Sequence, residues 1–181
     1  MPRLFLGLPL DAATQQALDQ FRAQQPAAPG VRWTPAVNRH VTLYFFGEIA
    51  PEMQDNLVAL LTLGLRDAQA FELAFDRYCL APRPRAPRMI WARYHKHAQF
   101  RELVQHLHSL YQQIDPQQQM RKSPVPHITL ARLRQWPEGQ PLAGPFPPLP
   151  ALSVREAILW ESTRQPGGTR YTEQARFGLR S

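Results

Sequence analysis

Apolar and polar residues alternate in short runs along the chain, and several of the turns between these runs contain glycine or proline. Runs of strand length that are rich in β-branched and aromatic residues predict extended segments rather than helices. They cover residues 3–8, 40–46, 71–80, 88–94, 127–133, 152–163 and 169–179. The last two flank Gly167-Gly168, a dipeptide typical of a tight hairpin turn, so we expect them to pair as antiparallel strands.

Apolar residues spaced three and four positions apart predict three amphipathic helices between these strands. Asp11 can cap the first helix, and Pro51 suits the first turn of the second. The apolar positions are Ala17, Leu18 and Phe21 in the first helix, Met53, Leu57, Leu60 and Leu61 in the second, and Phe100, Leu103, Val104, Leu107 and Leu110 in the third.

A proline-rich stretch, residues 137–150, has too few backbone donors for regular structure, and we expect it to cross the surface. Most neighbouring strands are joined by short turns, and the sequence contains no Gly-x4-Gly-Lys phosphate loop. The predicted fold class is α+β, with mainly antiparallel sheets and flanking helices in one domain over residues 1–181.

One short motif occurs twice, each time in a predicted strand, as His40-Val41-Thr42-Leu43 and His127-Ile128-Thr129-Leu130. Because side chains alternate between the two faces of a strand, the histidine and the threonine of each copy share one face. The apolar residues of each copy point the opposite way, into a core. Two such strands brought together would place two imidazoles and two hydroxyls in one cleft.

These groups suit the in-line hydrolysis of a phosphodiester, which needs a base on the attacking oxygen and an acid on the leaving oxygen. Histidine titrates near neutrality, so one copy can be neutral while the other is protonated. The hydroxyls of Thr42 and Thr129 can donate to the phosphate oxygens, where negative charge builds in the transition state. The alternative is that both histidines are hydrogen-bonded core residues, and the repetition of the motif with matched apolar partners disfavours it.

Charge and composition favour an anionic partner. The formal net charge is +7, and all but Lys96 and Lys122 of the 21 basic residues are arginine. Arginine makes bidentate contacts with phosphate and stacks on bases, although codon bias toward arginine gives the same composition. The single cysteine, Cys79, excludes an intramolecular disulfide and fits a cytoplasmic protein. No apolar run reaches the length of a membrane span, so we expect no membrane partner.

At the two motifs the sequence resembles the 2H phosphoesterases, which are named for two His-x-Thr/Ser-x motifs in two related lobes. It is most similar to the bacterial and archaeal RNA 2',3'-cyclic phosphodiesterases, first described as 2'-5' RNA ligases. The resemblance covers nearly the whole chain and is carried by residues 3–9, 38–47, 126–132 and 159–162 and by Tyr171. It implies a bilobal fold with pseudo-twofold symmetry and an active site in the groove between the lobes.

The resemblance also implies a role for each motif residue. His40 would give a proton to the leaving 3' oxygen, His127 would accept a proton from water, and the product would carry a 2'-phosphate. Thr42 and Thr129 would hold the phosphate together with Arg132, which follows the second motif. On an ideal strand Arg132 faces away from Thr129, so it reaches the phosphate only if the strand bulges or ends there. Otherwise Arg132 is a basic surface residue.

Three aromatic residues are candidates for stacking on a base, although each also suits core packing. They are Trp33, Tyr171 and Phe46, which shares the His40 face by strand parity. His95 and His97 would share a strand face, but no cysteine or carboxylate cluster completes a metal site. We therefore predict no metal and no other cofactor.

The sequence leaves three hypotheses open. The leading one is a monomeric, metal-independent enzyme that hydrolyses the 2',3'-cyclic phosphate end of an RNA to a 2'-phosphate. A second keeps the site but changes the reaction, to small cyclic nucleotides, to 2'-5'-linked oligonucleotides or to ATP-independent 2'-5' RNA ligation. A third is a module that binds RNA ends without turnover.

Overall fold

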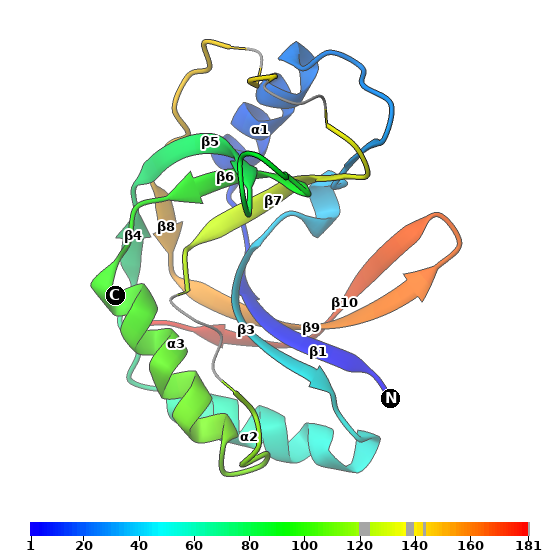
Figure 1. The fold of residues 1–181 in the computed structure, drawn as a ribbon. Helices are drawn as coiled ribbons and strands as arrows, with labels where there is room; N and C mark the ends of the chain where they lie inside the picture. The colour runs from blue at the N-terminus through cyan, green and yellow to red at the C-terminus, as the bar shows by residue number, and fades with distance from the viewer. Residues whose placement is uncertain (120–123, 137–139, 143, 181) are drawn as a thin grey trace.

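An antiparallel sheet of eight strands runs through the computed structural model, which describes residues 1–119, 124–136, 140–142 and 144–180 (Figure 1). The strand order is β10-β9-β1-β3-β7-β6-β5, and β2 pairs with β7 beside this path. The strands are β1 (Arg3–Leu8), β2 (Val31–Trp33), β3 (Val41–Glu48), β5 (Phe75–Ala81), β6 (Met89–Tyr94), β7 (His127–Leu133), β9 (Glu156–Gln165) and β10 (Gly168–Gly178). The predicted α+β class with antiparallel sheets is confirmed.

The sheet consists of two halves that meet at one residue pair. The pairing of β3 with β7 consists of Val41 opposite Ile128, and both side chains are fully buried. On one side of this contact lie β10, β9, β1 and β3, and on the other lie β7, β6, β5 and β2. Beyond the shared pair the two strands diverge (Figure 1).

Three helices cover the sheet, as the apolar spacing predicts. They are α1 (Ala12–Gln24), α2 (Gln54–Leu65) and α3 (Ala98–Tyr111), with short 3-10 turns η1 (Ala36–Asn38) and η2 (Pro51–Met53). The Asp11 carboxylate accepts the Thr14 N–H at 2.7 Å and caps α1. In α3, the Tyr111 hydroxyl donates to the Phe46 carbonyl of β3 at 3.2 Å, which fastens this helix to the first half of the sheet.

A second, two-stranded sheet corrects two of the predicted strands. Residues 71–80 form β4 (Phe71–Leu73) and then β5, and residues 152–163 form β8 (Leu152–Val154) and then β9. β4 pairs with β8, away from the large sheet. Apolar residues lie on both sides of each break, and neither break contains a glycine or a proline, so the pattern alone does not reveal that the chain changes sheet there.

The strand β2 was not predicted, because three residues between two proline-containing turns are too short to give an alternating pattern. Within the proline-rich stretch, the described residues 140–142 and 144–150 form neither helix nor strand, and residues 137–139 and 143 lie outside the described part. Among the described residues, no helix combines the length and the apolar character that a membrane crossing requires.

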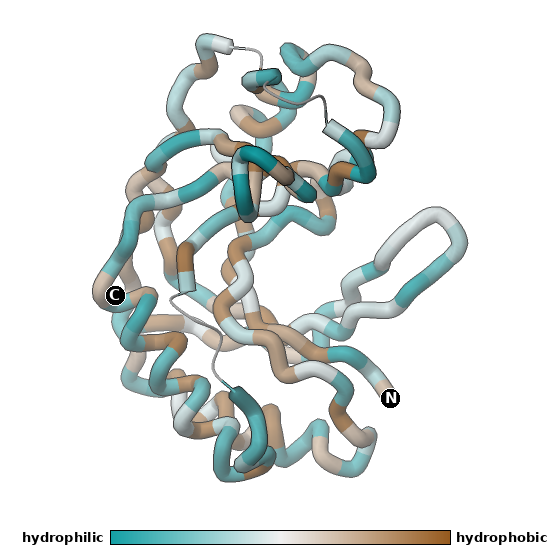
Figure 2. Tube along the Cα trace, in the orientation of Figure 1, coloured by the Kyte–Doolittle hydropathy of each residue, from teal (hydrophilic) through white to brown (hydrophobic). Residues whose placement is uncertain are grey.

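The apolar residues of the strands and of the inward helix faces form the core, and the hairpin of β9 and β10 carries mainly hydrophilic residues toward its turn (Figure 2). A β-bulge follows the motif in each of the two motif strands. In β3, the residues on either side of Leu43 pair with consecutive residues of β1, and in β7 the same holds for Leu130 against β6. Each of these bulges therefore adds one residue just after a His-x-Thr motif.

Candidate active site

A pocket of about 750 Å³ opens between the two halves of the sheet and contains both motifs. His40, Thr42, His127 and Thr129 all line it. Their arrangement follows from the pairing of Val41 with Ile128, since these two side chains point into the core and their neighbours point into the pocket.

Both imidazoles are held by the same backbone contact. The Nδ1 atom of His40 lies 2.8 Å from the Asn38 carbonyl oxygen, and Nδ1 of His127 lies 2.7 Å from the Val125 carbonyl oxygen. A carbonyl oxygen only accepts hydrogen bonds, so each Nδ1 carries the proton and donates. The neutral form of each ring therefore has its basic lone pair on Nε2. The Thr42 hydroxyl, 3.1 Å from Nε2 of His40, donates to that lone pair.

The ring of His40 lies within an aromatic enclosure. Its centroid is 4.7 Å from that of Phe5, 5.4 Å from that of Trp160 and 5.4 Å from that of Tyr171. Burial disfavours the charged imidazolium and lowers the pKa of His40 to about 4, although the bond to the Asn38 carbonyl raises it. The charge of His127 lowers this pKa further, because a second positive charge nearby opposes protonation.

His127 stacks on a single aromatic side chain, Trp91 of β6. The two ring centroids are 3.8 Å apart and the ring planes are inclined by 25°. Burial lowers the pKa of His127 also, against the opposite effect of its bond to the Val125 carbonyl. Both histidines are therefore neutral near pH 7.

The bulges decide which later side chains reach the pocket. After Leu43 the alternation in β3 is shifted by one, so Phe45 lines the pocket, whereas Phe46 is buried in the core with 4% of its surface exposed. The prediction that Phe46 shares the His40 face is therefore wrong. The same shift after Leu130 brings Arg132 into the pocket, which meets the condition that the sequence set for this arginine.

Trp33 and Tyr171, the other two candidates for base stacking, also line the pocket. Trp33 packs edge-on against Phe21 of α1 at 6.3 Å, and Tyr171 packs edge-on against Phe5 at 4.9 Å. Each ring thus belongs partly to the core and partly to the pocket wall. Their contact with a base stays a prediction.

Comparison with known proteins identifies the family. Residues 9–166 match the group described as the 2'-5' RNA ligase superfamily. The chain belongs to this superfamily.

Two relatives within the 2'-5' RNA ligase superfamily are RNA 2',3'-cyclic phosphodiesterases. The one from Methanothermobacter thermautotrophicus is 24% identical, and the match covers 98% of each chain. The one from Geobacillus stearothermophilus is 27% identical, and the match covers 89% of this chain but 52% of the relative. This chain thus spans about half the length of the Geobacillus protein.

Solved structures of other proteins share the fold. A Thermus thermophilus protein superposes with a TM-score of 0.84 at 25% identity, covering 98% of both chains. E. coli LigT in complex with 3'-AMP superposes with a TM-score of 0.77 at 27% identity, covering 100% of both chains. The antiparallel architecture with three helices is therefore LigT-like.

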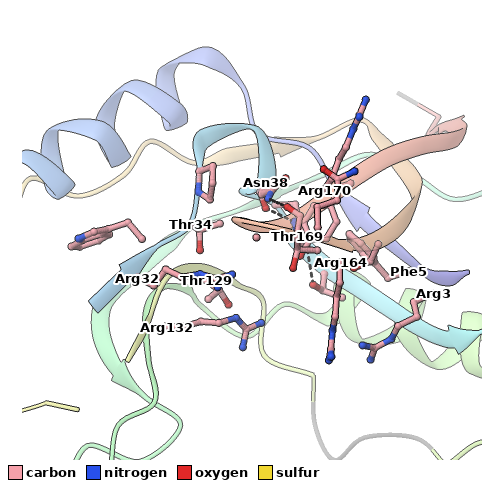
Figure 3. Close-up of a pocket in the computed structure, with 18 of the residues that line it drawn as sticks. Arg3, Phe5, Arg32, Thr34, Asn38, Thr129, Arg132, Arg164, Thr169 and Arg170 are labelled. Carbon is pink, nitrogen blue, oxygen red and sulfur yellow. Dashed lines mark hydrogen bonds between the residues drawn. The ribbon is translucent and has the colours of Figure 1, made fainter. Parts of the chain in front are cut away.

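The pocket of this superfamily member is strongly basic. Five arginines line it, and none of its described lining residues is Asp or Glu. Arg132 and Arg32 lie directly opposite one another on β7 and β2, whereas Arg3, Arg164 and Arg170 come from β1 and the hairpin of β9 and β10 (Figure 3). Among the described residues, no group of three or more His, Cys, Asp or Glu side chains is placed to hold a metal ion.

Sequence reasoning missed several residues of the pocket. Arg3, Arg32, Arg164 and Arg170 carry no local motif, and the abundance of arginine signals a basic site without saying where it lies. Trp91 is far from His127 in sequence, and their contact depends on the pairing of β6 with β7. Only the strand register brings these residues together.

Proposed function

We propose that this protein is an RNA 2',3'-cyclic phosphodiesterase that opens the terminal cyclic phosphate of an RNA and leaves a 2'-phosphate. The observation that carries the proposal is the pair of motif histidines, each tied through Nδ1 to a backbone carbonyl and each lining one pocket. Two relatives with this activity, at 24% and 27% identity, support it. We regard the two sheet halves as the two pseudo-symmetric lobes of a 2H fold, with this pocket as the groove between them.

His127 acts as the base. Nε2 of neutral His127 takes a proton from the attacking water, and the lowered pKa of this histidine keeps it in the neutral form that the step requires. Its Nδ1–H, held by the Val125 carbonyl, stabilises the imidazolium that forms.

His40 acts as the acid and gives its Nε2 proton to the leaving 3' oxygen. Because burial lowers the pKa of free His40 to about 4, the negative charge of the bound phosphate must raise that pKa before the step. An anion within hydrogen-bond reach favours the imidazolium, so the substrate itself brings His40 into its acidic form. When Nε2 is protonated it no longer accepts from Thr42, which frees the Thr42 hydroxyl to donate to the phosphate.

Thr42, Thr129 and Arg132 hold the non-bridging oxygens of the phosphate. The two hydroxyls donate one hydrogen bond each, and the Arg132 guanidinium offers a fork of donors that matches two oxygens. These donors form hydrogen bonds to the phosphate oxygens, on which negative charge develops as the oxygen of the attacking water approaches phosphorus. The proposed reaction uses no metal and no cofactor, so turnover in excess EDTA is expected to equal turnover without it.

The deciding experiment is turnover of an oligoribonucleotide that ends in a 2',3'-cyclic phosphate, measured in EDTA. The wild-type protein is expected to convert this end to a 2'-phosphate, and His40→Ala and His127→Ala are each expected to lose at least about 10²-fold in kcat. His95→Ala, at an exposed histidine outside the pocket, is the matched control and is expected to keep full activity. No conversion by folded wild-type protein would overturn the proposal.

The same site supports a second reaction, the ATP-independent joining of RNA ends through a 2'-5' linkage. The superfamily to which the chain belongs is named for this activity. In ligation a 5'-hydroxyl takes the place of water as the nucleophile, the bond from phosphorus to the 3' oxygen breaks as in hydrolysis, and a 2'-5' diester forms. Incubation of the cyclic-phosphate RNA with a second RNA distinguishes the two, since ligation lengthens the labelled strand. Tight binding of the cyclic-phosphate end with neither reaction would instead identify a non-catalytic RNA-end-binding module. The cytoplasmic location and the monomeric state stay predictions.

A further inference from the structure

The arginines of the pocket differ from several other arginines of the chain in their partners. Elsewhere arginines pair with carboxylates, such as Arg39 with Asp19 at 2.8 Å and Arg176 with Glu156. Within the described residues, none of the five pocket arginines forms an ion pair with Asp or Glu. Unpaired positive charges at one site repel one another and destabilise the folded protein, and a bound polyanion relieves this repulsion.

Four of the five pocket arginines form two groups at different positions. Arg32 stands directly opposite Arg132, so it lies beside the site of the terminal phosphate. Arg3 and Arg164 lie on the other half of the sheet. Arg3 pairs with Ser162, two residues before Arg164, so the two arginines are diagonal neighbours on the pocket face, about 7–8 Å apart in an ideal ladder. Figure 3 shows both side chains reaching toward the same region.

The hairpin of β9 and β10 extends this second group outward from the histidines. It projects from the body of the molecule beside the pocket, and its turn residues 165–168 still line the pocket (Figure 1). From Ser162 to Gln165 the strand advances about 10 Å, which adds length in one direction only. On the opposite side β2 is a three-residue strand and provides no such extension.

Two contacts hold this outer part of the pocket in place. The Arg3 guanidinium lies 5.7 Å from the centroid of the Phe45 ring, which fixes the charge at the pocket edge. The Asn38 side chain donates to the Thr169 carbonyl of the hairpin at 2.7 Å, while the Asn38 carbonyl accepts from His40. The hairpin is thus anchored to the same residue that orients His40.

We propose that Arg3 and Arg164 bind the phosphodiester backbone of the RNA strand that leads to the terminal cyclic phosphate. This inference rests on the proposed function and specifies its substrate class: an oligoribonucleotide whose strand leaves the pocket along the β9–β10 hairpin. The terminal phosphate contacts His40, His127 and Arg132, and the preceding phosphates contact Arg3 and Arg164. The terminal nucleoside then lies on the side of the pocket that Phe45 lines.

The test compares two substrates, 2',3'-cyclic AMP and a hexaribonucleotide that ends in a 2',3'-cyclic phosphate. The wild-type protein is expected to have a kcat/KM at least tenfold higher for the hexamer. The double variant Arg3→Gln/Arg164→Gln is expected to lose at least tenfold more activity on the hexamer than on cyclic AMP, mainly through KM. For the hexamer, the slope of log KM against log salt concentration is expected to decrease by about 1.4, or about 0.7 for each phosphate contact on a single strand.

Two single variants serve as controls. Arg101→Gln, on the exposed face of α3, removes one positive charge outside the pocket and is expected to leave kcat/KM unchanged for both substrates. Arg32→Gln is expected to reduce the activity on both substrates by the same factor, because Arg32 lies beside Arg132.

Equal losses of the double variant on both substrates would overturn this inference while leaving the proposed function intact. If the wild-type protein turns over neither substrate, the proposed function fails, and binding decides the inference separately. In that case fluorescence anisotropy with a labelled hexamer bearing a 3'-terminal phosphate is expected to give at least tenfold weaker binding by the double variant. Unchanged binding would overturn the inference.

Discussion

At the scale of single residues, the two motif histidines differ in what surrounds them rather than in how they are held. Each Nδ1 donates to the carbonyl of the residue two positions earlier. Three rings enclose His40, whereas Trp91 stacks on His127. The difference lies in the neighbouring strands, although burial lowers the pKa of both histidines.

Burying His40 makes the folded state sensitive to acid. The pKa of His40 is about 4 in the folded protein and near 6.5 when unfolded, so the unfolded state binds more protons between these values. The free energy of unfolding is therefore unaffected by the protonation of His40 above pH 6.5, and it falls as the pH drops from 6.5 toward 4 because protons bind preferentially to the unfolded chain. From pH 7 to pH 4.5, the free energy of unfolding of wild type is expected to fall by about 2 kcal/mol more than that of His40→Asn. Urea unfolding of both proteins at the two pH values measures the difference, and equal losses would contradict it.

Trp91 is expected to act as a positioning residue for His127. Trp91→Ala removes the stacked ring, and the resulting freedom of the imidazole is expected to lower kcat about 10-fold or more with little change in KM. Loss of cover is also expected to return the pKa of His127 toward 6.5, measurable by NMR titration of its ring protons. Trp91→Phe retains a flat ring and is expected to restore most of kcat. A purely structural role would lower stability and leave the pKa of His127 unchanged.

At the scale of elements, the bulges in β3 and β7 and the β9–β10 hairpin shape the pocket. Without the extra residues Leu43 and Leu130, strict alternation would turn Phe45 and Arg132 away from the pocket. The hairpin lengthens the pocket, and one side-chain hydrogen bond from Asn38 ties it to the segment before β3.

Breaking that tie is expected to loosen the hairpin while sparing the histidine. Asn38→Ala removes the donor to the Thr169 carbonyl but keeps the backbone carbonyl that accepts from His40. We expect a loss of about 1 kcal/mol in the free energy of unfolding and faster amide hydrogen exchange in the hairpin. Gln174→Ala is the matched control, because it removes an exposed amide contact, to Glu161, outside the pocket. Equal exchange in the two variants would show that Asn38 is not the anchor.

At the scale of the whole molecule, the proposed reaction needs one proton shared between the two halves of the sheet. In that proposal the active form of the pair carries a single proton, and both histidines have a lowered pKa in the free protein. Singly protonated free enzyme is therefore scarce at pH 8 and increases as the pH falls. We expect kcat/KM to rise about tenfold as the pH is lowered from 8 to 7. A kcat/KM independent of pH over this range, measured on the cyclic-phosphate RNA, would exclude this proton count.

Much of the fold could be predicted from the sequence, because the helices and the motif strands are long enough to display their periodicity. Asp11 caps α1 as expected, Pro51 begins the 3-10 turn that leads into α2, and the two motif segments form β3 and β7. The pocket itself depends on contacts between distant segments, such as Arg3 with Ser162 and Trp91 with Thr129, which no local pattern encodes. Phe46 was misplaced because a bulge leaves no trace in the pattern of apolar residues.

The two bulges also bear on how the pocket distinguishes one end of its ligand from the other. The two motif strands present the same imidazole and hydroxyl, and a pocket with only those groups would accept a phosphodiester in two opposite orientations. The fifth residue after each histidine differs, because Phe45 offers an apolar ring where Arg132 offers a positive charge. A nucleoside prefers the ring and a phosphate prefers the charge, so the ligand has a single favoured direction. In the proposed reaction, that direction sets which histidine meets the leaving oxygen and which meets water, a choice that neither motif makes by itself.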